Sequence, residues 1–341
     1  MRIGVLTGGG DCPGLNAAIR AVVKHGEIAY GHSVVGFRNG WKGVAEGEFQ
    51  PLTRGDVRSV LPLGGTILGT ARFHPHREPG GMDQVLETLK AEHIEGLICI
   101  GGDGTLHAAS KVAEQGVPIV GIPNTIDNDV EGTDQSIGFH TAVNIATEAI
   151  DRIHTTAESH NRVMVVEVMG RSAGWIANYA GMAGGAEVIL TPEKPFDIDA
   201  VCRSLIHRHR SHANFSIVVV AEGALPAEDS SMAYEAPVGP YGSIVAGAVS
   251  EAVKHEIQQR TGFDTRVTVL GHVQRGGTPT PTDRILGSRF GVAAVDALTQ
   301  GKSSVMTGIQ GDEVKLVDFD EIAGKVKKVP EELLYVAGVL S

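Results

Sequence analysis

The stretch LICIGGDGTLHAA, residues 97–109, decides the class of fold. An apolar run of strand type passes directly into three glycines, one aspartate and a threonine, and a helical pattern follows. Glycines between a buried strand and a helix make a tight turn, and they also leave backbone N–H groups open to a phosphate. The rest of the chain must decide between a plain turn and a phosphate site in which Asp103 holds a metal ion.

Short runs rich in Val and Ile alternate with longer amphipathic segments along most of the chain. Strands are predicted at 3–7, 34–37, 96–100, 119–122, 163–168, 188–191, 216–221 and 267–270. Helices are predicted at 16–29, 82–93, 106–115, 142–155, 199–209, 243–260 and 284–298. Near-continuous apolar strands are typical of a parallel sheet buried on both faces. The alternation therefore predicts an α/β fold with right-handed crossovers.

Length and charge narrow the class of protein. The 341 residues suit two domains, with a boundary near Gly138 and an exposed insertion or mobile loop at 224–242. A net charge of −11 argues against nucleic-acid or anionic-membrane partners, although arginines can still gather around a small anion. Three cysteines without C-x-x-C spacing, a strand at the very start and no apolar run near about 20 residues predict a cytoplasmic protein.

Six predicted strand ends carry glycine, acid or arginine. They read TGGGDCPG (7–14), GGDGT (101–105), PNTIDNDVEGTD (123–134), EVMGRSAG (167–174), AEG (221–223) and GHVQRGG (271–277). Ligands of open parallel sheets bind beyond the carboxyl ends of the strands. Turn chemistry explains one or two such ends but not six, so the pattern indicates a binding or catalytic site.

Two glycine loops, 8–10 and 101–104, would each place backbone donors and a helix N-terminus against a polyphosphate. Asp103 has no basic neighbour in the sequence and suits magnesium, bound directly or through water. A compatible alternative makes Asp103 the N-cap of a helix that begins near Leu106.

The TIDND stretch, which follows a strand that we expect Pro123 to end, is the most specific element. Phosphoryl transfer to a hydroxyl needs a carboxylate for the hydroxyl proton and magnesium for the phosphate charge. An Asx turn needs one residue, whereas four acids and amides crowd within eight positions here, at Asp127, Asn128, Asp129 and Asp134.

Arginines at loop and strand boundaries supply the opposite charge. Each alone reads as a surface residue, but as a set that converges on strand ends they suit bidentate recognition of phosphate. They are Arg72, Arg162, Arg171, Arg266 and Arg275. A dinucleotide fingerprint is absent, because the third glycine of the first loop comes one residue late.

Seven blocks together resemble the 6-phosphofructokinases, in that family's order and from residue 1 to about 300. The blocks are GVLTGGGDCPGLNAAIR, GGTILGTARF, IGGDGT, TIDND, GTDQSIGFHTA, VVEVMGRSAGW and TVLGHVQRGGTPTPTDR. The longer stretch at 224–242 is similar to the actinobacterial branch, which contains both ATP and pyrophosphate users. The resemblance implies two Rossmann-like three-layer α/β/α domains with mostly parallel sheets. Residues 1–138, joined by 275–325, would bind the nucleotide, and 139–274 would bind the sugar phosphate.

The implied reaction moves the γ-phosphoryl group of Mg²⁺–ATP to the 1-hydroxyl of fructose 6-phosphate. Residues implied around the nucleotide and magnesium are Gly9, Arg72, Phe73, Gly102, Asp103 (the metal ligand), Gly104 and Thr105. Residues implied at the reacting end are Gly104, Asn124, Thr125, Ile126, Asp127 (the base) and Arg171. The sugar-phosphate pocket would be formed by Met169, Gly170, Arg171, Glu222, His272, Val273, Gln274 and Arg275.

The resemblance also implies self-association, as a dimer or a tetramer with shared active sites. Arg162 and Arg266 would reach across from a neighbouring subunit. Four residues match the effector pocket of the bacterial relatives: Arg20, Lys24, Arg54 and Glu187. Two positions depart from it, because His154 stands where those relatives have arginine, and Ala213 with Asn214 stand near the position where they have lysine. We therefore predict a weaker or different effector response.

The choice of phosphoryl donor depends on two positions. In this family, pyrophosphate users carry aspartate where this chain has Gly104 and lysine where it has Asn124, so ATP is the predicted donor. The alternatives are a pyrophosphate-dependent phosphofructokinase and a silent regulatory subunit, which would be expected to have lost Asp127 or an arginine. Kinases of NAD or lipids share GGDGT but have no reason to carry TIDND, MGR and HVQRGG together.

Overall fold

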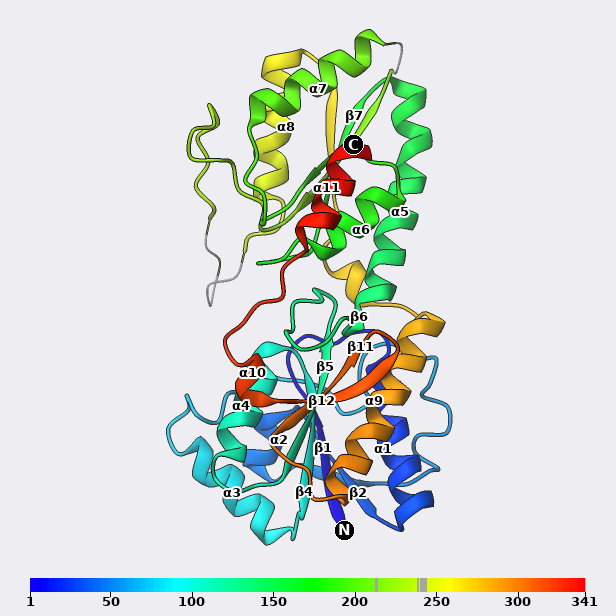
Figure 1. Cartoon of the computed structure of the whole chain (residues 1–341), viewed down its shortest axis with the longest axis vertical. Helices are drawn as coiled ribbons and strands as arrows, with labels where there is room; N and C mark the ends of the chain where they lie inside the picture. Colours follow the sequence, from blue (N-terminus) through cyan, green and yellow to red (C-terminus); the bar gives the residue numbers. More distant parts are fainter. Residues whose placement is uncertain (212–213, 238, 240–243, 341) are drawn as a thin grey trace. The chain divides into compact units, whose positions relative to one another are not determined.

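The computed structural model describes residues 1–211, 214–237, 239 and 244–340 (Figure 1). Several predictions fall partly outside the described residues. They concern Ala213, residues 238 and 240–242 of the predicted insertion, and residue 243, the first of the helix predicted at 243–260. The chain divides into two compact units: unit 1 is Met1–Thr141 with Arg275–Lys325, and unit 2 is Ala142–Gln274 with Val326–Ser341. No helix in the described part of the chain is long and apolar enough to cross a membrane.

Unit 1 is built on one mostly parallel sheet. Its strands are β1 (Arg2–Thr7), β2 (Ser33–Phe37), β3 (Phe49–Leu52), β4 (Gly96–Gly101), β5 (Ile119–Thr125), β6 (Ile137–Gly138), β11 (Val305–Gln310) and β12 (Glu313–Asp318). The order is β12-β11-β5-β4-β1-β2-β3, with β6 beside β5. Only β3 and β12, at the two ends of that order, pair in antiparallel fashion.

Helices cover both faces of this sheet. They are α1 (Leu15–Tyr30), α2 (Trp41–Glu46), α3 (Gly81–Ala91), α4 (Asp103–Ala113), α9 (Pro281–Thr299) and α10 (Phe319–Ile322). Successive strand side chains point to opposite faces, so Ile98 and Ile100 join the core under α1 and α9. Leu97 and Cys99 join the core under α2, α3 and α4. The result is three layers.

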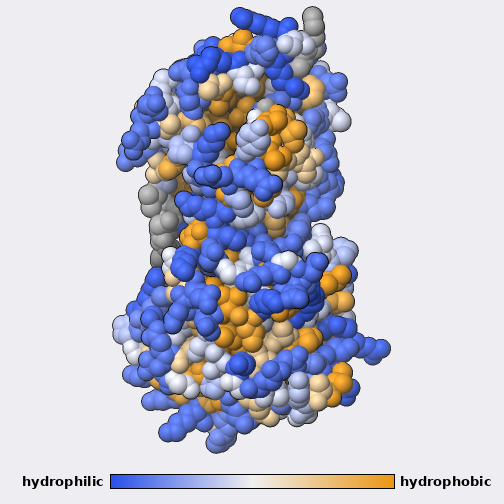
Figure 2. All heavy atoms as spheres, in the orientation of Figure 1, coloured by the Kyte–Doolittle hydropathy of each residue, from blue (hydrophilic) through white to orange (hydrophobic). Residues whose placement is uncertain are grey.

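Unit 2 repeats the layout on a smaller parallel sheet with the order β10-β7-β9-β8. Its strands are β7 (Val163–Val168), β8 (Val188–Leu190), β9 (Ser216–Ala221) and β10 (Thr265–Val269). Its helices are α5 (Phe139–His160, which begins in unit 1), α6 (Trp175–Ala183), α7 (Ile198–Arg210), α8 (Ala248–Thr261) and α11 (Glu331–Leu340). Apolar side chains reach the surface around α11 (Figure 2), where Tyr335, Val339 and Leu340 are exposed.

The predicted α/β fold with mostly parallel sheets is confirmed, and three boundaries need correction. Helix α4 begins at Asp103, three residues before Leu106. Pro123 does not end its strand, because β5 continues to Thr125, where β6 pairs with it. The helix expected at 243–260 begins only at Ala248, after Gly247 in a left-handed conformation.

Candidate active site

Three neighbouring strands of unit 1 bring the predicted phosphate loops together. Strand β4 pairs in parallel with both β1 and β5, so the three carboxyl ends lie at one edge of the sheet. The loop after β1 is tied to β4 by Gly8 N, which donates to Ile100 O at 2.9 Å. The far side of that loop is held by Thr70 Oγ1, which donates to Gly9 O at 2.7 Å.

Two glycines of the first loop lie close to residues that are distant in the sequence. A Cβ on Gly8 would lie 2.6 Å from Thr105 Oγ1, in the second glycine loop. A Cβ on Gly10 would lie 2.3 Å from Arg275 Nη1. Both distances are shorter than any normal contact, so a Cβ on Gly8 would push against Thr105, and a Cβ on Gly10 would displace the Arg275 guanidinium. The structure thus brings Gly8–Gly10, Thr105 and Arg275 together in unit 1.

Asp103 is the first residue of α4 and is exposed. The N-cap position belongs to Gly102, so the alternative in which Asp103 caps the helix is wrong. A carboxylate in the first turn of a helix is stabilised by the helix dipole and stays available to a cation. In the described part of the chain no group of three or more His, Cys, Asp or Glu side chains could hold a metal ion by itself.

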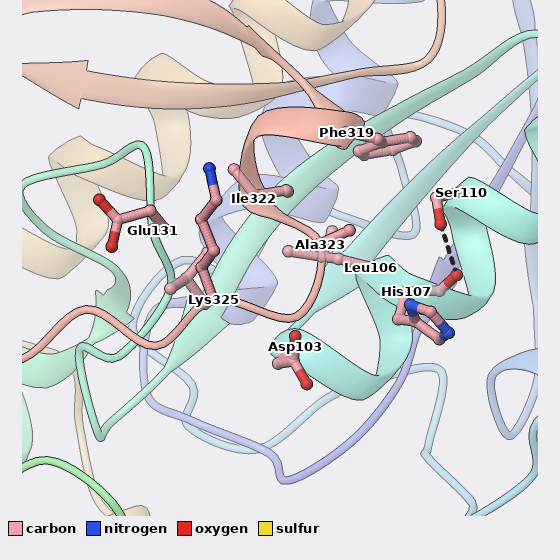
Figure 3. A pocket seen from close by; sticks show the side chains of 10 residues that line it. Asp103, Leu106, His107, Ser110, Glu131, Phe319, Ile322, Ala323 and Lys325 are labelled. Carbon is pink, nitrogen blue, oxygen red and sulfur yellow. Dashed lines mark hydrogen bonds between the residues drawn. The ribbon is translucent and has the colours of Figure 1, made fainter.

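A small pocket lies beside the start of α4 (Figure 3). Leu106 and Phe319 form part of its apolar lining, and Asp103 lies at one end. Glu131 and Lys325 lie on the side away from His107 (Figure 3). The pocket borders the predicted metal ligand but contains none of the other implied nucleotide residues.

The end of β5 carries buried polar side chains. Asn124 is 1% exposed, and neither its Oδ1 nor its Nδ2 has a hydrogen-bond partner among the described residues. Thr125 and Asp127 are also buried, and Asp127 N donates to Thr125 Oγ1 at 3.2 Å. The Ile126 side chain lies in the core, so only its backbone can face a ligand. Buried polar groups normally have partners, so an unsatisfied amide here indicates a ligand or water position.

The acids and amides of the TIDND region divide into two roles. Asn128 has a φ of 51° and its Oδ1 accepts from Ser136 N at 2.9 Å. Asp134 Oδ2 accepts from Gly311 N at 2.7 Å. Asn128 therefore fixes the loop from 128 to 136, and Asp134 fixes that loop to the turn after β11. The sequence alone did not distinguish these structural roles from the role predicted for Asp127.

The pKa of the buried Cys12 thiol shows which charges surround the first loop. Burial raises it to about 12; Arg275 opposes the shift, while Asp127 and Asp11 add to it. Asp127 and Arg275, which are far apart in the sequence, therefore both lie near Cys12. Cys12 itself stays a neutral thiol at any physiological pH.

Unit 2 gathers a second set of predicted residues at the carboxyl ends of β7, β9 and β10. Gly170, with a φ of 142°, lets the chain turn after β7, and Gly223 N donates to Gly170 O at 3.2 Å. This contact joins the turn that carries Arg171 to the turn that carries Glu222. The predicted residues of this edge are Met169, Gly170, Arg171, Glu222, His272, Val273 and Gln274.

Gln274 has a mainly structural part within this set. Its side chain is fully buried. The amide Oε1 accepts from Met169 N at 3.3 Å, and Nε2 donates to Gly271 O at 3.0 Å. The Gln274 amide therefore ties the short 3₁₀ turn (Gly271–Arg275) to the end of β7. Its neighbour Val273 is 62% exposed and is the side chain free to contact a ligand.

Two of the five arginines lie at the opposite edge of the unit 2 sheet. Arg162 directly precedes β7, and Arg266 is the second residue of β10, whereas Arg171 follows β7. The six residues of β7 separate the two edges by about 20 Å. Within one chain, Arg162 and Arg266 therefore lie at the amino edge of this sheet and Arg171 at its carboxyl edge, and the prediction that Arg162 and Arg266 serve a neighbouring subunit stays a prediction.

The residues matched to an effector pocket fall in both units. Arg20, Lys24 and Arg54 line a basic pocket on unit 1. In unit 2, the Glu187 carboxylate accepts from Ile217 N and pairs with Arg208 at 2.5 Å. The predicted weaker effector response remains a prediction.

Fold and site together define an α/β phosphotransferase. Comparison with known proteins agrees: the model of the phosphofructokinase family matches residues 2–298. The chain is 49% identical to an ATP-dependent 6-phosphofructokinase of Corynebacterium efficiens over 97% of its own length and 96% of that protein. It is 50% identical to a pyrophosphate–fructose 6-phosphate 1-phosphotransferase of Streptomyces coelicolor over 99% of both chains.

Solved structures show the same architecture. A phosphofructokinase of Pichia pastoris in the T-state superposes with a TM-score of 0.84 at 34% identity, over 99% of this chain. This chain spans 36% of the length of that yeast chain. The protein therefore belongs to the phosphofructokinase family. Its near relatives are divided between two phosphoryl donors.

Proposed function

We propose that the protein is an ATP-dependent 6-phosphofructokinase, which phosphorylates the 1-hydroxyl of fructose 6-phosphate. One observation carries the proposal: a single sheet edge of unit 1 brings two glycine loops, the buried Asp127 and Arg275 together. Backbone donors and a guanidinium bind phosphate, and a buried carboxylate can accept a proton.

In the proposed step, the γ-phosphoryl group passes directly from ATP to the sugar. The sugar O1 forms a bond to the γ-phosphorus as the bond to the β–γ bridging oxygen breaks, and ADP leaves. Asp127 takes the proton of the hydroxyl, and Arg171 stabilises charge on the transferred group. Met169, Glu222 and His272 would orient the sugar phosphate from unit 2.

Magnesium fits the residues of unit 1. Mg²⁺ is commonly held by one or two carboxylates together with substrate phosphates and water. The exposed Asp103 at the start of α4, beside two phosphate loops, offers such a carboxylate. The ion would supply charge neutralisation for the transferred phosphate. Gly9, Arg72, Phe73, Gly102 and Thr105 would hold the donor around it.

The donor is inferred from Gly104 and Asn124, since the relatives are divided. Gly104 bears no carboxylate that would repel an α-phosphate. A Cβ at this position would lie 3.2 Å from His74 Cε1. Asn124 is neutral, and its buried amide cannot offset the charge of pyrophosphate as a lysine would. Both positions favour ATP over pyrophosphate.

Self-association follows from the position of two arginines. Arg162 lies about 20 Å from the carboxyl edge that carries Arg171, and Arg266, which pairs with Met164, lies about 13 Å from it, so we infer that they do not bind the same small sugar as Arg171 within one chain. We infer that they complete the site of a neighbouring subunit. The partners are then fructose 6-phosphate, ATP and a second copy of the chain.

The deciding experiment is a donor comparison on the purified full-length protein. Fructose 6-phosphate and Mg²⁺ are supplied with either ATP or pyrophosphate, and fructose 1,6-bisphosphate is measured by a coupled assay. We expect turnover with ATP to exceed turnover with pyrophosphate. Faster turnover with pyrophosphate would show that pyrophosphate, and not ATP, is the donor. No product with either donor would favour a silent regulatory subunit.

A further inference from the structure

One carboxylate in unit 2 contacts both arginines that lie at the amino edge of the sheet. Asp264 Oδ2 accepts from Arg162 Nε at 2.6 Å, and Asp264 Oδ1 lies 2.8 Å from Arg266 Nη1. Each carboxylate oxygen therefore binds a different guanidinium. We propose that Asp264 is a positioning residue, which holds Arg162 and Arg266 side by side as one preformed anion-binding pair. This inference rests on the proposed function of the two arginines.

The backbone brings the three residues together independently of the ion pairs. Val163 N donates to Asp264 O at 3.1 Å, and Thr265 and Val163 are partners in the β10–β7 ladder. Asp264 directly precedes β10 and lies two positions before Arg266, and its Oδ1 reaches Nη1 of that arginine. The carboxylate thus has a fixed base between the two arginines.

The arginines keep donors for an anion after binding Asp264. The contacts with Asp264 use Nε of Arg162 and Nη1 of Arg266. Within the described residues, the terminal nitrogens of Arg162 donate no hydrogen bond. The side chains of Arg162, Asp264 and Arg266 are 28%, 42% and 50% exposed, so the pair is open to a ligand. Two guanidiniums against one carboxylate leave a net positive charge for phosphate.

The charges around Asp264 keep it ionised. Its pKa is lowered, first by the hydrogen bond from Arg162 and further by the charges of Arg266, Arg162 and His160. These are the charged groups that face it from the end of α5, from the turn before β7 and from β10. At neutral pH the carboxylate therefore binds both guanidiniums.

Two opposing effects set the expected size of a substitution. Without the carboxylate, two long side chains lose their fixed positions and must be ordered by the substrate, which weakens binding by about 5- to 30-fold. Removal of a negative charge would strengthen phosphate binding by only a few-fold at this exposed position. We expect the loss of order to dominate.

The test substitutes Asp264 in the full-length protein. Asp264→Asn should raise the KM and the calorimetric Kd for fructose 6-phosphate by about 5- to 30-fold, with kcat within about twofold and an unchanged KM for the donor. Asp264→Glu should recover most of the affinity. In an Arg162→Ala background, Asp264→Asn should add less than about threefold, because the group that it holds is gone.

Asp199→Asn is the matched control. Asp199 Oδ1 pairs with Arg260 at 2.6 Å, is 43% exposed and lies in the same unit, and among the described residues it makes no ion pair with Arg162 or Arg266. It should leave the KM unchanged. An unchanged or lower KM in Asp264→Asn, or an equal rise in Asp199→Asn, overturns the proposal. A wild-type protein inactive with both donors would instead refute the proposed function.

Discussion

The two units place their candidate residues in different ways. In unit 1, the glycine loops, Asp127 and Arg275 all lie at the carboxyl edge of one sheet. In unit 2, Arg171 and Glu222 lie at the carboxyl edge, while Arg162 and Arg266 lie at the amino edge. The residues of the proposed phosphate-donor site thus share one edge within one chain, whereas we have proposed that two arginines of the sugar-phosphate site come from a second chain.

The largest effect is expected from removing the base proposed in unit 1. Asp127→Asn keeps the size of a buried side chain but removes the proposed base, so kcat should fall by about 10²- to 10⁴-fold. Binding of fructose 6-phosphate, measured by calorimetry, should stay close to that of the wild type. Activity within tenfold of wild type, in a protein with an unchanged melting temperature, would falsify the role of Asp127.

The next prediction tests the donor side of unit 1. Gly104→Asp adds a carboxylate beside His74 and the proposed phosphates, so kcat/KM for ATP should fall by at least about 100-fold. Gly104→Ala is the control, because it adds the same Cβ without charge and should cost no more than about fivefold. Asn124→Gly should change ATP use less than Gly104→Asp does. Equal losses for the aspartate and alanine variants would show that space, and not charge, selects the donor.

Mixing two inactive variants tests whether the site of unit 2 is shared. Arg162→Ala and Asp127→Asn subunits, each nearly inactive alone, should form hybrids in which one interface carries both native residues. For random exchange in a dimer, this arrangement restores about a quarter of wild-type activity. Activity is followed after subunit exchange has been verified by native mass spectrometry. No recovery would mean that Arg162 acts within its own chain.

The smallest effect concerns cysteine reactivity, with no change in turnover. Burial raises the pKa of Cys12 in unit 1 to about 12 and that of Cys202 in unit 2 to about 11. At pH 8 the thiolate fractions are then about 1 in 10,000 and about 1 in 1,000. Maleimide pulses with peptide mass spectrometry should label Cys202 first. Faster labelling of Cys12 would contradict the close packing around the first loop.

Much of the fold could be predicted because the central strands are continuous apolar runs between helical patterns. The strands at 163–168 and 216–221 coincide with β7 and β9. The short elements β3, β6, α2 and α10 were missed, since two to six residues carry too little periodicity. The β11–β12 hairpin was also missed, because the exposed face of β12 dilutes its apolar pattern.

Site residues were found where side-chain chemistry is visible in the sequence. Gln274, Asn128 and Asp134 show the limit of that reasoning. The sequence counted them among the polar residues of the site, and in the structure their side chains accept from backbone N–H groups of Met169, Ser136 and Gly311, respectively. Asp264 was missed altogether. A lone aspartate before a short strand has no local signal, and its proposed role depends on Arg162, which precedes β7, and on Arg266 in β10.

The sequence by itself determined the α/β class, the family and the chemical nature of the site, because glycines, carboxylates and arginines at strand ends are local features. Tertiary structure alone decided which of them meet. The parallel order of β1, β4 and β5 brings the two glycine loops and Asp127 to one edge. The direction of β7 sends Arg162 and Arg171 to opposite edges although only nine positions separate them in the chain. Strand direction and order are set by packing across the whole sheet, and no local stretch of residues encodes them.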